Sequence, residues 1–218
     1  MNILVEAAVE SLDDALAAVD GGADRLELCA NLADGGTTPS EDLIADVVEQ
    51  VDIPVFVMIR PRGGSFVYST TELEEMRRSI DRARELDVDG FVFGVLNSSN
   101  RIDTIRTQSL IDVAADLPVT FHRAFDRVHD RIDALDALMD LGIARVLTSG
   151  GAPTARQGLA SLRELVEVAG DGIVILAGGG VRFQNVLELV DETGVQEVHA
   201  RCEMQADRIR AIRDALTE

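Results

Sequence analysis

Lysine is absent from the sequence, so all 20 of its cationic side chains are arginine. Lysine supplies the amine that forms a Schiff base with carbonyl substrates and with pyridoxal phosphate. Its absence excludes both chemistries, except through the N-terminal amine. We therefore expect no pyridoxal phosphate cofactor, and a bound phosphate would have to be held by arginine or by backbone N–H groups.

Positive charge is scarce as a whole. The chain carries 39 acidic residues against the 20 arginines, which gives a net charge of −19. Nucleic acids and anionic membranes bind to basic surfaces, so neither is expected as a partner. An acidic surface without lysine is typical of proteins that stay soluble in high salt, where ions screen the self-repulsion. The composition therefore predicts a halophilic source.

Long hydrophobic runs and a cysteine framework are missing too. No apolar run reaches the roughly 18 residues that span a bilayer, and the opening MNILVEAAVESLDD lacks the basic start of a signal peptide. The two cysteines, Cys29 and Cys202, are too few for a disulfide framework, and an intracellular chain keeps them reduced. We expect a soluble, cytoplasmic protein with one sizeable hydrophobic core.

Strand-like and helix-like segments alternate along the whole chain. The spacing of the strands leaves room for a crossover helix after each one, which indicates parallel pairing. The repeat predicts an α/β protein that forms one (β/α)8 TIM barrel domain over residues 1–218. An open doubly wound sheet is the alternative, although no GxGxxG follows the first strand. The predicted strands are 2–7, 25–29, 54–60, 90–95, 118–123, 144–149, 172–178 and 195–200.

Polar residues gather where the predicted strands end, whereas the amino ends look plain. Chemistry in such barrels collects at the carboxyl ends of the strands. We expect Glu6, Glu27, His122 and Asp126 to be catalytic, with His122 as a general base that Asp126 or Glu27 orients. The alternative is structural: Glu6, Glu27 and Arg60 would form an ion network that plugs the barrel, because a buried carboxylate must be paired or protonated.

Three loops at the same end carry groups that suit an anion. The segment 60–69 reads as a mobile lid with arginines that clamp a phosphate or carboxylate. The glycine-rich turns 148–155 and 177–185 offer backbone N–H groups for an anion nest. Alternatively, the arginines neutralise acidic neighbours and the glycines only permit tight turns. The expected anion-binding residues are Arg60, Arg62, Arg123, Asn31, Ser149, Gly179 and Gly180.

A soft-metal site is a separate hypothesis. Cysteine, methionine and histidine suit Cu(I). Strands eight, one and two follow one another around a closed barrel, so Cys29, His199 and Cys202 are candidate ligands of a copper ion. No CxxC, MxxM or HExxH spacing occurs in the sequence. The alternative is that each cysteine is a small buried hydrophobe.

Several long motifs resemble those of the CutC copper-homeostasis family. They cover nearly the whole chain: ADRLELCANLADGGTTPS (23–40), IRPRGGSFVYS (59–69), GFVFGVL (90–96), VTFHRAFD (119–126), RVLTSGG (145–151) and AGGGV (177–181). The resemblance implies a cytoplasmic (β/α)8 barrel that is usually a homo-oligomer. It also implies a role in copper homeostasis, and copper binding through cysteines has been proposed for some members.

Carried over residue by residue, the resemblance extends to the predicted mouth of the barrel. This sequence departs from the family after the histidine of the last strand, where it reads HARCEM, so Cys202 has no family counterpart. We expect a copper-homeostasis protein that binds Cu+; the alternative is an enzyme that acts on a small anionic metabolite, phosphorylated or carboxylated. The matching mouth residues are Glu27, Cys29, Asn31, Arg60, Arg62, His122, Arg123 and Asp126.

Overall fold

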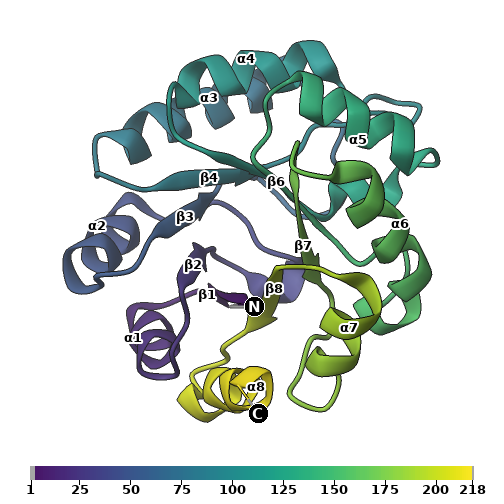
Figure 1. Cartoon of the computed structure of the whole chain (residues 1–218). Coiled ribbons are helices and arrows are strands. Elements are labelled where there is room, and N and C mark those ends of the chain that lie inside the picture. Colours follow the sequence, from purple (N-terminus) through teal and green to yellow (C-terminus); the bar gives the residue numbers. More distant parts are fainter. Residues whose placement is uncertain (1–2, 218) are drawn as a thin grey trace.

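Eight parallel strands close into a barrel in the computed structural model, which describes residues 3–217 (Figure 1). Each strand pairs with the next one in the chain, and β8 pairs back with β1. The predicted (β/α)8 barrel is confirmed, and the open-sheet alternative is excluded by that closing pair. The strands are β1 (Leu4–Val9), β2 (Arg25–Leu28), β3 (Val55–Met58), β4 (Gly90–Phe93), β5 (Val119–Phe121), β6 (Arg145–Thr148), β7 (Val174–Gly178) and β8 (Glu197–Arg201).

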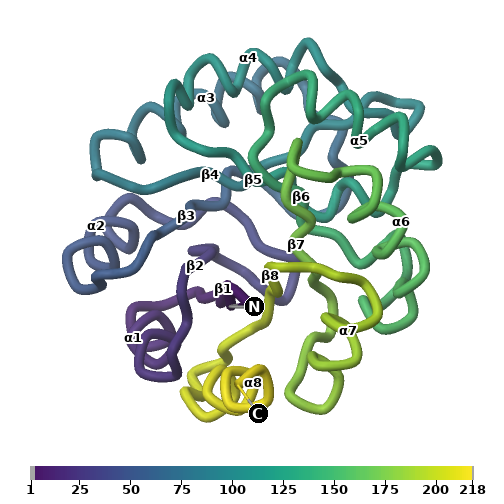
Figure 2. The backbone as a smooth tube through the Cα atoms, viewed as in Figure 1, coloured from purple at the N-terminus to yellow at the C-terminus, as the bar shows by residue number. Residues whose placement is uncertain are grey.

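A helix follows each strand, and the helices form an outer ring around the barrel (Figures 1 and 2). They are α1 (Leu12–Asp20), α2 (Glu41–Gln50), α3 (Thr70–Arg84), α4 (Thr104–Ala114), α5 (Arg131–Asp140), α6 (Leu159–Ala169), α7 (Val186–Thr193) and α8 (Ala206–Thr217). Short 3-10 helices lie in three of the connections: η1 (Leu32–Asp34), η2 (Arg123–Arg127) and η3 (Ala155–Gly158).

Short polar residues begin many of these helices. The Ser69 hydroxyl accepts a hydrogen bond from the backbone N–H of Glu72, and the Glu72 carboxylate accepts one from the N–H of Ser69, which completes a capping box. Ser11, Ser40, Asp103 and Asp130 cap α1, α2, α4 and α5 in the same way, through the N–H three residues on. These caps fix where each helix leaves the loop that follows its strand.

The two faces of each strand have different surroundings. In β2, Leu26 and Leu28 belong to the main hydrophobic core between strands and helices, whereas Glu27 faces the inside of the barrel. Inside, the apolar cluster is small and consists of Ala8, Cys29, Leu32, Phe56, Met58 and Val92. Much of the remaining interior is therefore filled by charged side chains, which need partners.

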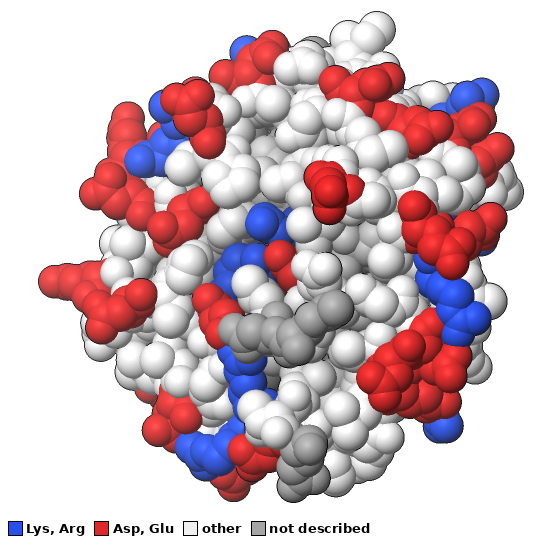
Figure 3. Space-filling model, in the orientation of Figure 1, with Lys and Arg blue, Asp and Glu red and all other residues white. Residues whose placement is uncertain are grey.

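Acidic side chains are spread widely over the face seen in Figure 3, with smaller basic groups between them. This pattern agrees with the net charge of −19. Across residues 3–217, no helix combines the length and the apolar composition that a membrane crossing requires.

Candidate functional site

A cavity of about 810 Å³ opens at the carboxyl ends of the strands. Seven of the eight strands, or the loops after them, contribute one or more side chains each, including Glu27, Met58, His122, Leu147 and His199. Of the residues expected from the sequence, eight line this cavity: Glu27, Arg60, His122, Arg123, Asp126, Gly179, Gly180 and His199. Six lie outside its lining: Glu6, Cys29, Asn31, Arg62, Ser149 and Cys202.

The amino-terminal half of the barrel interior holds an ion network. Arg25 donates to Glu6 and to Glu197, each at 2.5 Å, and Arg145 lies 3.4 Å from Glu197. Both guanidinium groups also lie over the Phe56 ring, at 5.1 and 4.9 Å from its centroid. Burial alone would raise the pKa of Glu6, but the Arg25 charge and a bond from His199 lower it to about 2. We expected no notable polar residues at the amino ends of the strands, and this expectation is wrong.

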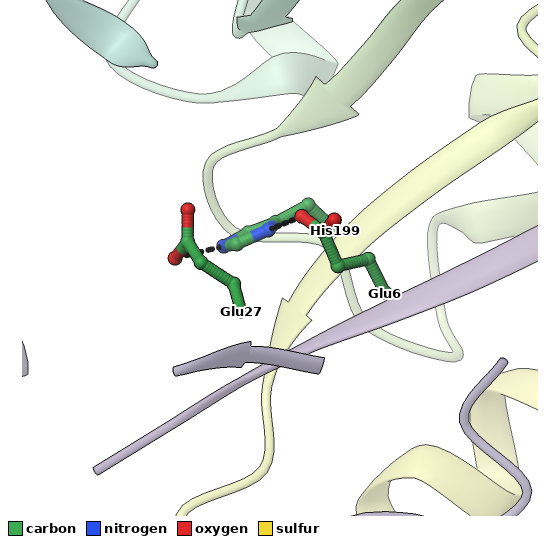
Figure 4. Close-up of side chains that lie close together, drawn as sticks. All are labelled: Glu6, Glu27 and His199. Atoms are coloured by element: carbon green, nitrogen blue, oxygen red, sulfur yellow. Dashed lines mark hydrogen bonds and ion pairs between the residues drawn. The ribbon is translucent and has the colours of Figure 1, made fainter. Parts of the chain in front are cut away.

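His199 joins this network to the cavity (Figure 4). Its Nδ1 is 2.8 Å from Glu6 Oε1, and its Nε2 is 3.8 Å from Glu27 Oε2. The register explains the meeting, because Glu6 of β1 pairs with His199 of β8, and Glu27 lies one strand further. Burial opposes the charged imidazole, but the two carboxylates outweigh it and raise the pKa of His199.

Glu27 is a buried carboxylate that has few hydrogen-bond partners. Its Oε1 has no hydrogen-bond partner among the described residues, while its Oε2 accepts from the Cys29 thiol at 3.5 Å. Burial is the main reason that the pKa of Glu27 is raised. Burial and the Glu27 charge also raise the pKa of Cys29 well above its usual value, so Cys29 is a neutral thiol.

His122 is held by the backbone and by aromatic packing. Its Nδ1 accepts the N–H of Ala124 at 3.3 Å, and the Phe66 ring lies 4.9 Å away, centroid to centroid. Burial and the nearby Arg60 charge lower the pKa of His122 to about 3, so the ring is neutral. No carboxylate bonds to it within the described chain, and the expectation that Asp126 or Glu27 orients a basic His122 is wrong.

The Asp126 carboxylate forms its hydrogen bonds with groups other than His122. Its carboxylate accepts from the hydroxyl of Thr148 at 2.5 Å, from the N–H groups of Ser149 and Gly151 at 3.0 Å each, and from Arg123 Nε at 2.8 Å. The physical reason is its place in η2, which turns the carboxylate across to the loop after β6 rather than back toward β5. Asp126 therefore fixes the 148–151 turn and the Arg123 side chain.

The arginines of segment 60–69 hold that loop in place through hydrogen bonds. Arg60 donates to the carbonyls of Asp34, Gly36 and Gly64, at 2.8 to 3.3 Å. Arg62 bonds to Glu72 at 2.5 Å and to carbonyls of its own loop. Arg60 is thus no partner of Glu6 or Glu27, and Arg62 points to α3 instead of the cavity. The interpretation of this segment as a mobile clamp has no support in these contacts.

The predicted metal group of Cys29, His199 and Cys202 does not form. Cys29 belongs to the apolar cluster inside the barrel, whereas Cys202 belongs to the main hydrophobic core between strands and helices, here called the outer core. Cys202 directly follows β8, where its backbone N–H still bonds to Ala8 of β1, and its parity is opposite to that of His199. Burial and Asp14 raise the pKa of Cys202 to about 11. Both cysteines are free. In residues 3–217 the group whose ligand atoms lie within 4.8 Å of one another is Glu6, Glu27 and His199.

The sequence indicated that Arg25 could form a buried pair, because it has the inward parity of Glu27, and the structure confirms a buried pair for it. Sequence reasoning missed three residues that shape the interior: Phe66, Arg145 and Glu197. A signal existed for two of them, because Arg145 and Glu197 are charged residues at the starts of strands. Phe66 gave no such signal, because it lies in an irregular loop.

The chain matches the model of the CutC family over residues 3–204. A human protein described as a copper homeostasis protein cutC homolog is 46% identical over 204 residues, which are 94% of this chain and 75% of that protein. A CutC family protein of Mesorhizobium japonicum is 46% identical over 196 residues, 90% of this chain and 76% of its own.

Solved structures agree with the fold. The crystal structure of the putative copper homeostasis protein CutC from Streptococcus agalactiae superposes with a TM-score of 0.88 at 39% identity, over 93% of this chain and 100% of that one. Thiamine phosphate pyrophosphorylase from Pyrococcus furiosus gives a TM-score of 0.68 at 16% identity, over 99% and 95% of the two chains. The second likeness is one of fold alone.

Proposed function

The chain belongs to the CutC family, and from this premise we propose that it acts in copper homeostasis by binding a copper ion at the base of the barrel mouth. One observation carries the proposal: a thiol and an imidazole nitrogen converge on one carboxylate. Cys29 Sγ lies 3.5 Å and His199 Nε2 lies 3.8 Å from Glu27 Oε2, and the other oxygen of Glu27 has no partner in the described chain.

The donor atoms fit Cu(I) in part. Thiolate and imidazole are ligands that Cu(I) prefers. The thioether side chain of Met58 is close by, because Met58 and Cys29 both come within 3.5 Å of where a Cβ on Gly36 would lie. Binding requires the Cys29 thiol to lose its proton, and Glu27 is the base beside it. Cu(I) affinity should therefore rise with pH.

An anaerobic Cu(I) titration against a competing chelator tests this proposal. We expect about one tight equivalent, with affinity at least tenfold weaker in Cys29→Ser and in His199→Gln. Cys202→Ser is the matched control, because Cys202 is also a free, buried thiol but lies in the outer core. An affinity unchanged in Cys29→Ser, or lowered equally in Cys202→Ser, would reject the site.

The size of the cavity favours a second candidate, an enzyme or binding protein for a small anionic metabolite. A metal ion does not need about 810 Å³, whereas small-molecule pockets have volumes of this order. The lining brings cationic Arg60 and Arg123 together with Glu27 and His122. Glu27, with its raised pKa, is the acid or base in this proposal, and Arg123 beside Gly179 binds the anion.

The same proposal covers the setting of the protein: a cytoplasmic homo-oligomer that works in high salt, without nucleic-acid or membrane partners. The net charge of −19 and the absence of lysine support the salt adaptation and the lack of nucleic-acid or membrane partners. Unfolding midpoints measured from low to molar KCl test the salt adaptation, and a midpoint that does not rise contradicts it. Light scattering after gel filtration gives the subunit number.

A further inference from the structure

Three buried polar atoms that lack a hydrogen-bond partner in the described chain belong to residues that line the same cavity. They are Glu27 Oε1, Arg60 Nε and His122 Nε2, on residues that are only 3%, 4% and 3% exposed. Leaving such an atom unpaired is costly, so native proteins rarely do so without water or a ligand. The polarity of these atoms indicates what would bind.

His122 Nε2 is a donor. Its Nδ1 accepts the backbone N–H of Ala124, so Nδ1 carries no proton. A neutral imidazole then carries its single proton on Nε2. Burial, together with the nearby Arg60 charge, keeps the ring neutral. His122 therefore presents an N–H to the cavity, and its free nitrogen is not available as a base.

Arg60 Nε is also a donor, and its position is fixed. The two terminal nitrogens of Arg60 already donate to three backbone carbonyls, which leaves the Nε–H group unused. The Phe66 ring lies 4.9 Å from the Arg60 guanidinium carbon and 4.9 Å from the His122 ring centre. One aromatic ring thus packs against both donors.

Gly94 leaves room for the His122 ring. A Cβ at position 94 would come within 2.6 Å of His122 Nδ1 and 2.7 Å of its Cε1. Contacts that short do not occur, so a larger residue would displace the ring from its bond with Ala124. The orientation of the Nε2–H group is therefore set by Gly94 directly after β4, by the backbone of η2 and by Phe66 together.

We infer that Arg60 Nε–H and His122 Nε2–H form a two-donor site for a carbonyl or carboxylate oxygen of a small molecule, whose neighbouring hydroxyl group bonds to Glu27. This inference rests on the second candidate function; it shares Glu27 with the proposed copper site, but its two donors, Arg60 and His122, are not copper ligands there. Two fixed donors bind an oxygen that gains negative charge better than water does, because they need no reorganisation. His122 is thus a substrate-binding donor here, in place of the general base that its sequence position indicated.

A ligand titration with matched variants tests the site. The probes are glycolate, which has a carboxylate and a hydroxyl group, dihydroxyacetone, which has a neutral carbonyl group, and inorganic phosphate. His122→Phe removes the donor and keeps a ring, and His122→Gln returns an N–H at similar reach. We expect glycolate or dihydroxyacetone to bind about tenfold more weakly to His122→Phe, and His122→Gln to recover most of the affinity. His129→Phe, an exposed histidine, is the control.

The outcomes separate the two proposals. If glycolate or dihydroxyacetone binds equally well to His122→Phe and to the wild type, the two-donor site is wrong and the small-molecule pocket stands. If phosphate alone binds, the two-donor site is again wrong. If none of the probes binds, both the two-donor site and the small-molecule pocket are overturned for this class of ligand.

A second measurement needs no variant and no ligand. Long-range proton–nitrogen NMR spectra of the wild-type protein distinguish the two neutral imidazole tautomers. We expect His122 to be protonated at Nε2 between pH 6 and 8. A proton on Nδ1, or a doubly protonated ring, would overturn the inference whatever the titrations give.

Discussion

The two halves of the barrel interior treat buried charge in opposite ways. In the amino-terminal half, Arg25 is paired with Glu6 and Glu197 at 2.5 Å each. In the carboxyl-terminal half, Glu27, Arg60 and His122 each keep one atom without a partner in the described chain. Glu6, Arg25, Glu27, Arg60 and His122 are all at most 4% exposed. Apart from Arg145 Nε, which lies 3.4 Å from Glu197 without a hydrogen bond, the two halves differ in pairing. This difference separates groups that stabilise the barrel from groups that are available to bind a ligand.

His199 marks the boundary between the halves. One of its nitrogens lies 2.8 Å from Glu6, in the paired network, and the other lies 3.8 Å from Glu27, at the cavity (Figure 4). A ligand or metal that engages Glu27 therefore changes the surroundings of His199 as well. Variants on either side of His199 should behave differently, and three measurements test this.

The largest loss of stability is expected when the ion network in the amino-terminal half of the barrel is broken. Arg25→Met leaves Glu6 and Glu197 buried without their main cation, and such losses cost about 3–5 kcal/mol. The free energy of unfolding in urea measures it. The control is Arg82→Met, which breaks a pair with Glu41 whose side chains are 62% and 56% exposed; it should cost under about 1 kcal/mol. Equal losses in the two variants would show that the network is not structural.

A smaller loss of stability is expected when the pH falls and His122 becomes protonated in the unfolded chain. Its pKa is about 3 in the folded protein and about 6.5 when unfolded, so the unfolded chain takes up the proton first. The folded state should therefore lose about 2 kcal/mol between pH 6.5 and 4.5 on account of this residue. Glu6, with a pKa of about 2, contributes below pH 4.5 only.

The difference between the wild type and His122→Gln isolates this pH effect. We expect their unfolding free energies to converge or cross as the pH falls through this range, because the variant has no imidazole to protonate. Parallel curves from pH 6.5 to 4.5 would mean that His122 is charged or solvent-exposed in the folded protein.

The smallest effect is expected from Glu27→Gln. Burial raises the pKa of Glu27, so its ionised form opposes folding at neutral pH, and this opposition fades as the pH falls toward the unfolded value. A neutral amide should leave stability unchanged or raise it by about 1 kcal/mol at pH 7. Urea unfolding at pH 7 and pH 5 measures the change, with Glu6→Gln as the matched variant. A loss as large as that of Glu6→Gln would place Glu27 in the paired half.

The sequence predicted the barrel because its signals were local and repeated. Alternating strands and helices, and caps such as Ser69 with Glu72, specify each unit independently of the others. Glu27, Arg60 and His122 were also expected at the mouth, because parallel strands bring their carboxyl ends together. All three line the cavity.

Pairings across the interior were harder to predict, since they depend on side-chain reach and loop shape. Asp126 follows His122 by four residues, yet the turn of η2 directs it to Thr148 and Ser149. Arg60 donates hydrogen bonds to backbone carbonyls of neighbouring loops, and no local sequence pattern specifies the conformation of those loops. By contrast, the outward position of Cys202 follows from strand parity and was predictable.

The bond between Arg25 and Glu197 joins residues 172 positions apart. A ribosome must therefore release the chain at least as far as Glu197 before Arg25 can meet that acceptor. Until then the partial barrel exposes strand edges and holds an incompletely neutralised arginine, so early strands gain little from folding ahead of the last one. Biogenesis of this protein should accordingly be late and cooperative, with chaperone dependence concentrated before β8 emerges.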